Sequence, residues 1–66
     1  MTKTITGDFR TEDAMRNAMD DLLSAGIPRE QLFMDAGMMS LKVITPEVTA
    51  PEVNEILTRH QPVQLH

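Results

Sequence analysis

Three methionines close together in the sequence, Met34, Met38 and Met39, and the two histidines, His60 and His66, have the chemistry of soft-metal ligands. Thioether sulfur atoms bind Cu(I), and imidazole is the commonest metal ligand. The methionines belong to the apolar segment LFMDAGMMSLKVI (residues 32–44), where they serve equally well as fillers of a packed interior. The two histidines lack a nearby third donor. The sequence therefore favours a structural role for this set and no cofactor, with a soft-metal site as the alternative.

Carboxylates suited to acid–base chemistry occur as two pairs, Asp20 with Asp21 and Glu52 with Glu55. Both pairs are predicted on solvated helix faces, and no nucleophile or base is spaced to use them. We therefore expect no catalytic residues, and a protein that is not an enzyme.

Arg10 and Thr11 are candidates for a small-anion site in the loop between the first predicted strand and helix. Backbone N–H groups at a helix N-terminus, together with Arg10, could hold such an anion. An ordinary helix start explains the same residues, because Thr is a frequent N-cap. The cap is the favoured interpretation and the anion site is the alternative.

Composition narrows the function further. The chain has 66 residues, no cysteine and a formal charge of −4, which excludes disulfides and thiol catalysis and argues against a nucleic-acid partner. No run approaches the roughly 20 apolar residues of a membrane span, and the first residues lack the apolar core of a signal peptide. We expect one domain (residues 1–66) that is cytoplasmic and has no membrane partner. Its small core makes oligomerisation an attractive supplement to stability.

The first half of the chain predicts a strand and then a helix. Residues 3–9 alternate, and Gly7 among them suggests a bulge or the close approach of another backbone. A helix is predicted over about residues 12–25, capped by Thr11. It should end at Gly26 in the left-handed conformation, with Pro28 preventing its continuation.

The second half predicts two strands, a helix and a last short strand. QLFM (residues 31–34) and MMSLKVIT (residues 38–45) are expected to pair in antiparallel fashion around the turn DAG. Thr49 and Glu52 have the spacing of a capping box at the start of the second helix. Residues 63–65 alternate as the final strand.

This β-α-β-β-α-β order predicts an α+β fold, the ferredoxin-like sandwich. Its four-stranded antiparallel sheet has the order 4-1-3-2 and carries both helices on one face. The apolar residues expected in one core are Ile5, Phe9, Met15, Ala18, Met19, Leu22, Leu41, Val43, Val53, Ile56, Leu57 and Val63.

Two long segments, residues 4–34 and 40–65, resemble the small domain of bacterial YflT-type heat-induced or general stress proteins. In that family a strand ending in Phe leads to a Thr/Ser-capped helix and an "aaGip" turn, as in TITGDF, TEDAM and SAGIP here. A Val-rich strand and a helix ending in "IL.RHGPV" follow, as in ILTRHQPV, where Gln61 replaces the usual Gly. The resemblance implies this fold and a stress-related context, with no active site to carry over.

One face of the predicted sheet should remain uncovered by helices. On it we expect an apolar patch of Phe33, Met38 and Ile44, larger than a stable monomer of this size usually exposes. We therefore predict a non-enzymatic interaction or regulatory module. It would form a homodimer, or bind another protein chain, through this patch or through the edge strand at residues 32–34. The alternative is a small-ligand or metal-binding domain that uses the first loop or the methionine–histidine set.

Overall fold

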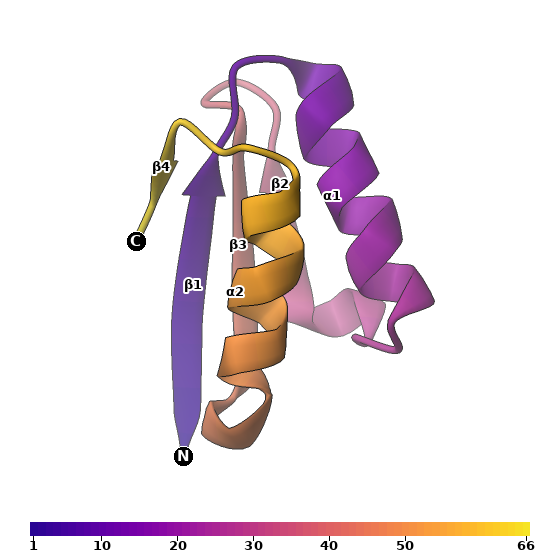
Figure 1. The fold of residues 1–66 in the computed structure, drawn as a ribbon, viewed down its shortest axis with the longest axis vertical. Coiled ribbons are helices and arrows are strands. Elements are labelled where there is room, and N and C mark those ends of the chain that lie inside the picture. Colours follow the sequence, from indigo (N-terminus) through magenta and orange to yellow (C-terminus); the bar gives the residue numbers. More distant parts are fainter.

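The computed structural model describes every residue from Met1 to His66 as one α+β unit (Figure 1). Its elements in chain order are β1 (Thr2–Asp8), α1 (Glu12–Ser24), η1 (Arg29–Gln31), β2 (Leu32–Asp35), β3 (Ser40–Pro46), η2 (Glu47–Thr49), α2 (Ala50–Arg59) and β4 (Gln64–Leu65). The two η elements are single 3₁₀ turns that lead into β2 and α2. No helix of the structure combines the length and the apolar character needed to span a membrane.

The four strands form one sheet in the order β2-β3-β1-β4, and every neighbouring pair is antiparallel. This is the predicted order 4-1-3-2 counted from the opposite edge, so the predicted fold class is confirmed. Both helices pack on the same side of the sheet (Figure 1). Strands β1 and β3 pair over seven residues each, whereas β4 pairs with only two residues of β1.

The core lies between the sheet and the helices. Alternation along β1 and β3 points Ile5, Leu41 and Val43 toward the helices, where they meet the apolar stripes of α1 and α2. Two members of the predicted core are placed differently: Met19 is only partly buried at its rim, and Val63 is 58% exposed. Val63 precedes β4 instead of belonging to it, because the strand begins at Gln64. Three buried apolar residues, Ile27, Leu32 and Ala50, were not among those predicted for the core.

The predicted start and end of α1 are confirmed. The Thr11 hydroxyl accepts a hydrogen bond from the Ala14 N–H at 3.1 Å, as an N-cap does. At the other end Gly26 has φ +98°, and the N–H groups of Gly26 and Ile27 donate to the carbonyls of Leu23 and Leu22. These two bonds satisfy carbonyls that the helix leaves free and turn Ile27 into the core.

The start of α2 differs from the prediction, because no capping box forms. Thr49 ends the 3₁₀ turn with φ −92° and ψ −13°, and its side chain makes no capping hydrogen bond. A capping side chain needs the extended backbone of an ordinary N-cap to reach the next turn. Pro51 lies in the first turn of α2, where its missing N–H costs nothing.

The hairpin between β2 and β3 also differs, because its turn is longer than predicted. Met38 and Met39 lie in the turn and not in β3, which begins at Ser40. The Asp35 carboxylate accepts a bond from the Met38 N–H at 3.3 Å, and Met39 takes a positive φ of 52°. The side-chain cap and the left-handed residue together close a turn that DAG alone would not span.

Gly7 sits in regular pairing with both neighbouring strands, so the predicted bulge is absent. The close approach comes from a side chain, since a Cβ at this position would lie 3.2 Å from the buried Phe9 ring. The close neighbour of Gly7 is therefore an aromatic ring and not another backbone, and a larger residue here would need the ring to shift by a few tenths of an ångström.

Candidate interaction surface

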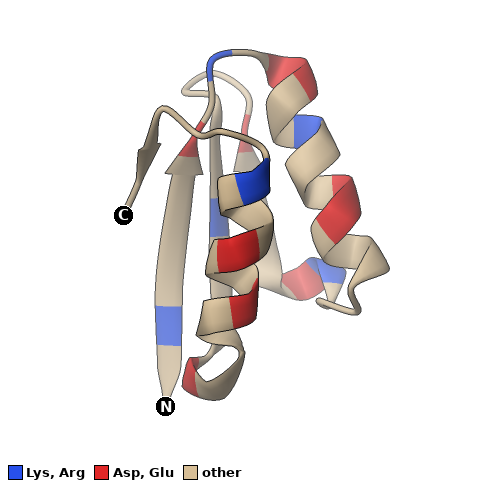
Figure 2. Cartoon of the chain, in the orientation of Figure 1, with Lys and Arg blue, Asp and Glu red and all other residues tan.

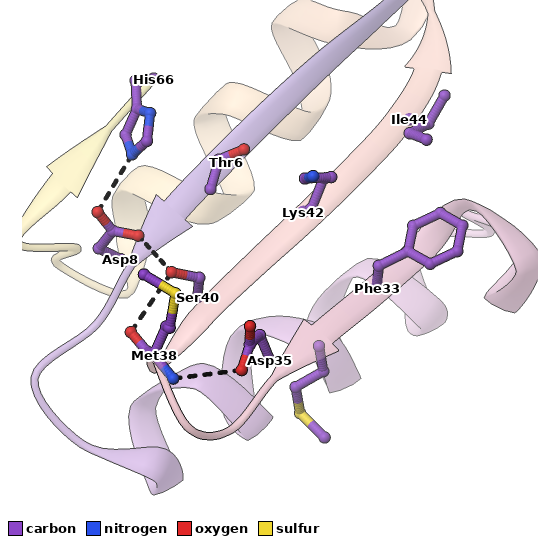
Figure 3. A pocket seen from close by; sticks show the side chains of 10 residues that line it. Thr6, Asp8, Phe33, Asp35, Met38, Ser40, Lys42, Ile44 and His66 are labelled. Carbon is purple, nitrogen blue, oxygen red and sulfur yellow. Dashed lines mark hydrogen bonds and ion pairs between the residues drawn. The ribbon is translucent and has the colours of Figure 1, made fainter.

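The sheet face away from the helices is uncovered, and we call it the open face. A shallow hollow of about 630 Å³ lies on it (Figure 3). The side chains that line this hollow come from β1, β2 and β3, from the hairpin turn and from His66 after β4: Thr6, Asp8, Phe33, Met34, Asp35, Met38, Ser40, Lys42, Ile44 and His66. The open face therefore joins segments from both ends and the middle of the sequence.

The three predicted interface residues all lie on this face. Phe33 is 50% exposed, Met38 73% and Ile44 37%, although each is a large apolar side chain. Register places Phe33 opposite Lys42, two residues along β3 from Ile44, while Met38 stands at the turn beyond Ser40. All three therefore line one hollow, with Met38 at one end and Ile44 at the other (Figure 3). Their role as an interface stays a prediction.

Polar contacts order one end of the open face (Figure 3). The Ser40 hydroxyl donates to one oxygen of Asp8 at 2.6 Å, and His66 Nε2 lies 3.1 Å from the other oxygen. The hydrogen bond from Ser40, followed by the contact with His66, lowers the pKa of the Asp8 carboxyl below its usual range. Asp8 therefore links β1 to β3 on one side and to the end of β4 on the other.

These three residues do not form a nucleophilic site. In such a site the histidine accepts the serine proton, and the carboxylate orients the histidine from behind. Here the Asp8 carboxylate lies between Ser40 and His66, so the histidine is not positioned to accept the serine proton. The arrangement joins strands.

The soft-metal candidates are divided among several places. Met34, Met38 and His66 line the hollow of the open face, whereas Met39 does not. Met34 is 40% exposed at the edge of the sheet, contrary to the expectation that it packs. No three residues of the His, Cys, Asp and Glu types are grouped as a metal site.

His60 has a structural contact. It is the C-cap of α2, and its Nε2 lies 2.7 Å from a carboxylate oxygen of Asp21 on α1. This contact ties the two helices together and corrects the expectation that Asp21 lies only on a solvated face. The other predicted pair, Glu52 and Glu55, lies on the exposed side of α2, where Glu55 pairs with Arg59 at 3.2 Å.

Arg10 and Thr11 line none of the three principal hollows of the structure. The Thr11 hydroxyl is occupied by the N-cap bond, and Arg10 is exposed without an ion pair. The anion site at this loop stays a prediction.

The sequence analysis missed the grouping of Asp8, Ser40 and His66. The Asp8–His66 contact joins residues 58 positions apart, and it depends on the register of β4 against β1. Asp8 lies on the open face beside Ser40, but no local pattern of the sequence indicates which side chains meet it there.

Comparisons of the chain with family models, with curated proteins and with solved structures found no match. The resemblance to YflT-type proteins therefore stays a prediction.

Proposed function

We propose that this protein is a non-enzymatic interaction module that pairs with a second copy of itself through the open face. The observation that carries the proposal is the exposed apolar group of Phe33, Met38 and Ile44 around Lys42, a cation without an ion pair. Apolar side chains gathered on one face favour burial against another protein. The small core of the domain gains further stability from such burial.

Side chains on the open face form rows that run across the strands, and successive rows are roughly 6.6 Å apart. Two neighbouring rows set the charge pattern: Asp35, Ser40 and Asp8 in the first, and Phe33, Lys42 and Thr6 in the second. One row therefore carries two carboxylates at its ends, and the next carries a cation at its centre.

A two-fold axis that crosses the strands between these rows makes the face complementary to itself. Lys42 then lies between the partner's Asp8 and Asp35, and the partner's Lys42 takes the equivalent place. The same rotation sets Ile44 against the partner's Met38 in the hairpin turn. It also sets Phe33 against the partner's Asp35. The face therefore pairs with itself through opposite charges and one apolar contact, and an isologous interface uses the same patch on both copies.

The size of the face predicts that the pairing is weak. Four strands about 4.8 Å apart and up to seven residues long present roughly 400 Å² per copy, about half of the ~800 Å² typical of a stable complex. We expect a dimer that forms at micromolar concentration or above and dissociates on dilution.

The oligomeric state tests the proposal most directly. The unmodified protein should show a concentration-dependent mass between monomer and dimer in sedimentation equilibrium. Ile44→Asp should shift it to the monomer, because two carboxylates would be buried per interface. Helix content measured by circular dichroism should not change. A monomer mass for the unmodified protein at about millimolar concentration would contradict the proposal.

Reversing the charge of Lys42 distinguishes this arrangement of the two copies from other ways in which they could associate. Lys42→Asp should weaken the dimer, because it sets like charges against the partner's Asp8 and Asp35. Lys3→Asp is a matched control on the other face of the sheet and should leave the dimer unchanged. Equal effects of the two reversals would point to net charge and not to the open face.

The resemblance to YflT-type proteins supports a stress-related context, which measurement of the protein level after heat shock would test. The competing function is the binding of a small ligand or soft metal. Stabilisation by metal ions or small anions in a thermal-shift panel, with no dimer, would favour that function.

A further inference from the structure

The outer edge of β1 is only half covered. β4 pairs with Gly7 and Asp8, and beyond it Thr6 and His66 exchange two backbone hydrogen bonds of 2.5 and 2.8 Å. In an antiparallel strand the backbone groups of alternate residues point to the same side. The N–H and C=O groups of Thr2 and Thr4 therefore point to the same edge as those of Thr6, where no strand lies beside them.

A second hollow, of about 460 Å³, lies beside this uncovered edge, between β1 and α2. Its apolar part includes Ile5 and Leu65, and its polar part includes Asn54 and Thr58, one turn apart on α2. Lys3 also lines it and has no ion pair. A single cation thus stands next to unpaired backbone groups and an apolar wall.

Lys3 shares its lack of an ion pair with Lys42, whereas two arginines of the helices are paired. Acidic residues are frequent on the two helices, whereas the strands carry both signs (Figure 2). The only ion pairs of arginine are within the helices, Glu12 with Arg16 and Glu55 with Arg59. Lys3 is therefore free to pair with a group brought by another molecule.

We propose that this edge binds an extended acidic peptide, which adds to β1 as a strand in line with β4. Strand addition to an exposed edge supplies backbone hydrogen bonds, and pockets for alternate side chains supply specificity. The peptide runs antiparallel to β1, and its residues lie opposite Ile5, Thr4 and Lys3 in turn. The first and third of these point into the hollow and the second points to the open face.

The lining of the hollow specifies which side chains fit. An apolar residue fits opposite Ile5, beside Leu65, and a carboxylate fits opposite Lys3. The peptide therefore carries the pattern apolar, any residue, then Asp or Glu, read from its N-terminus. Opposite charges on directly paired residues stabilise a sheet, and like charges destabilise it.

The same argument disfavours a second copy of this chain at the edge. Two β1 edges paired through Thr2 and Thr4 would set Lys3 against the partner's Lys3. The peptide site is also separate from the proposed dimer, because Lys3 and the hollow face the helices while the dimer uses the open face. Each proposal can therefore fail without the other.

Amide NMR with two synthetic peptides tests the proposal. One is a blocked strand-forming peptide with the core Val-Thr-Glu, and the other replaces Glu by Lys. The Glu peptide should shift the amide signals of Thr2, Lys3 and Thr4 and slow the hydrogen exchange of Thr2 and Thr4. The Lys peptide should bind at least tenfold more weakly. Equal binding of the two peptides, or no binding of either, would overturn the proposal.

A charge swap in the protein provides the second measurement. Lys3→Glu should lower the affinity for the Glu peptide at least tenfold and restore the affinity for the Lys peptide, because the paired charges are exchanged. Lys42→Glu changes the same charge on the open face and should leave the affinity for both peptides unchanged. Ile44→Asp should also bind the Glu peptide normally. Loss of binding with Lys42→Glu, or no effect of Lys3→Glu, would place the contact elsewhere and refute the assignment.

Discussion

The two faces of β3 differ in what their side chains contribute to the protein. On the face toward the helices Leu41, Val43 and Thr45 are completely buried. On the open face Lys42 is exposed, and Ile44 keeps 37% of its surface in water. One strand of seven residues therefore supplies the centre of the core and the centre of the candidate interface.

The buried face supplies most of the stability of the fold, and recognition is the role that we propose for the open face. Full burial of a Leu or Val side chain stabilises a fold by about 1.5–3 kcal/mol, which a small domain needs from most of its core. The open-face side chains gain little of this until a partner covers them. Folding of the monomer therefore gains little from their apolar character, whereas the proposed pairing would gain from it.

The largest expected effect compares truncations on the two faces. Leu41→Ala should destabilise the fold by about 2–5 kcal/mol, because it removes buried methyl groups and leaves a cavity. Ile44→Ala, three residues further along β3, should lower the free energy of unfolding by less than about 1 kcal/mol, because part of that side chain is already in water. Urea denaturation at low protein concentration measures both. Similar losses for the two variants would mean that the open face also supports the monomer.

The sequence predicted those features of the two faces that depend on neighbouring residues. Alternation along residues 40–45 is local, so it placed Leu41 inside and Ile44 outside correctly. The end of α1 at Gly26 was predicted for the same reason, because Gly, Ile and Pro in succession are a local sequence signal for a helix that ends in a left-handed residue. Elements of this kind follow from neighbouring residues alone.

Other features depend on which distant segments meet. Val63 was expected in the core because VQL alternates, but β4 begins only at Gln64 and leaves Val63 in solvent. The contact of Asp8 with His66 follows from the register of that same short strand. Neither can be derived from local periodicity, because a two-residue strand has almost none.

Thr45 breaks the pattern of the buried face and gives the second prediction. Its hydroxyl is fully buried and has no hydrogen-bond partner. Thr45→Val keeps the shape and removes the unsatisfied group, so it should stabilise the fold by about 1–2 kcal/mol. The urea midpoint should rise. Thr6→Val, on the open face of β1, is the control and should change stability by less than about 0.5 kcal/mol. A loss of stability for Thr45→Val would show that a water molecule satisfies the hydroxyl.

The third prediction concerns Gly26, whose backbone conformation contributes to stability on the helix-covered side of the sheet. Gly26→Ala should destabilise by about 1 kcal/mol, because Ala resists the positive φ that Gly adopts freely. Nothing lies within 4 Å of the added methyl group, so the cost comes from the backbone alone. Ala25→Gly, at the preceding position with φ −78°, is the matched control. A neutral Gly26→Ala in urea melts would mean that the cap relaxes without cost.

The smallest expected effect is the contribution that the open face itself makes to folding, through Asp8. Hydrogen bonds from Ser40 and His66 hold the pKa of Asp8 below its usual range in the folded protein. The charged carboxylate therefore favours the folded state at pH values above ~3.9, the usual pKa of Asp. This contribution disappears as the pH falls through the lower pKa of the folded state.

Urea melts of the unmodified protein and of Asp8→Asn, compared across this acid range, measure the contribution. The difference in stability should shrink as the pH falls, since the unmodified carboxyl becomes neutral like the amide. Ser40→Ala should shrink the same difference at neutral pH, because it removes the strongest of the bonds that lower the pKa. Asp8 lies on a solvent-facing surface, so the effect should be well below that of Leu41→Ala. A difference that grows as the pH falls would mean that Asp8 opposes folding, and the division of roles between the two faces would then be sharper still.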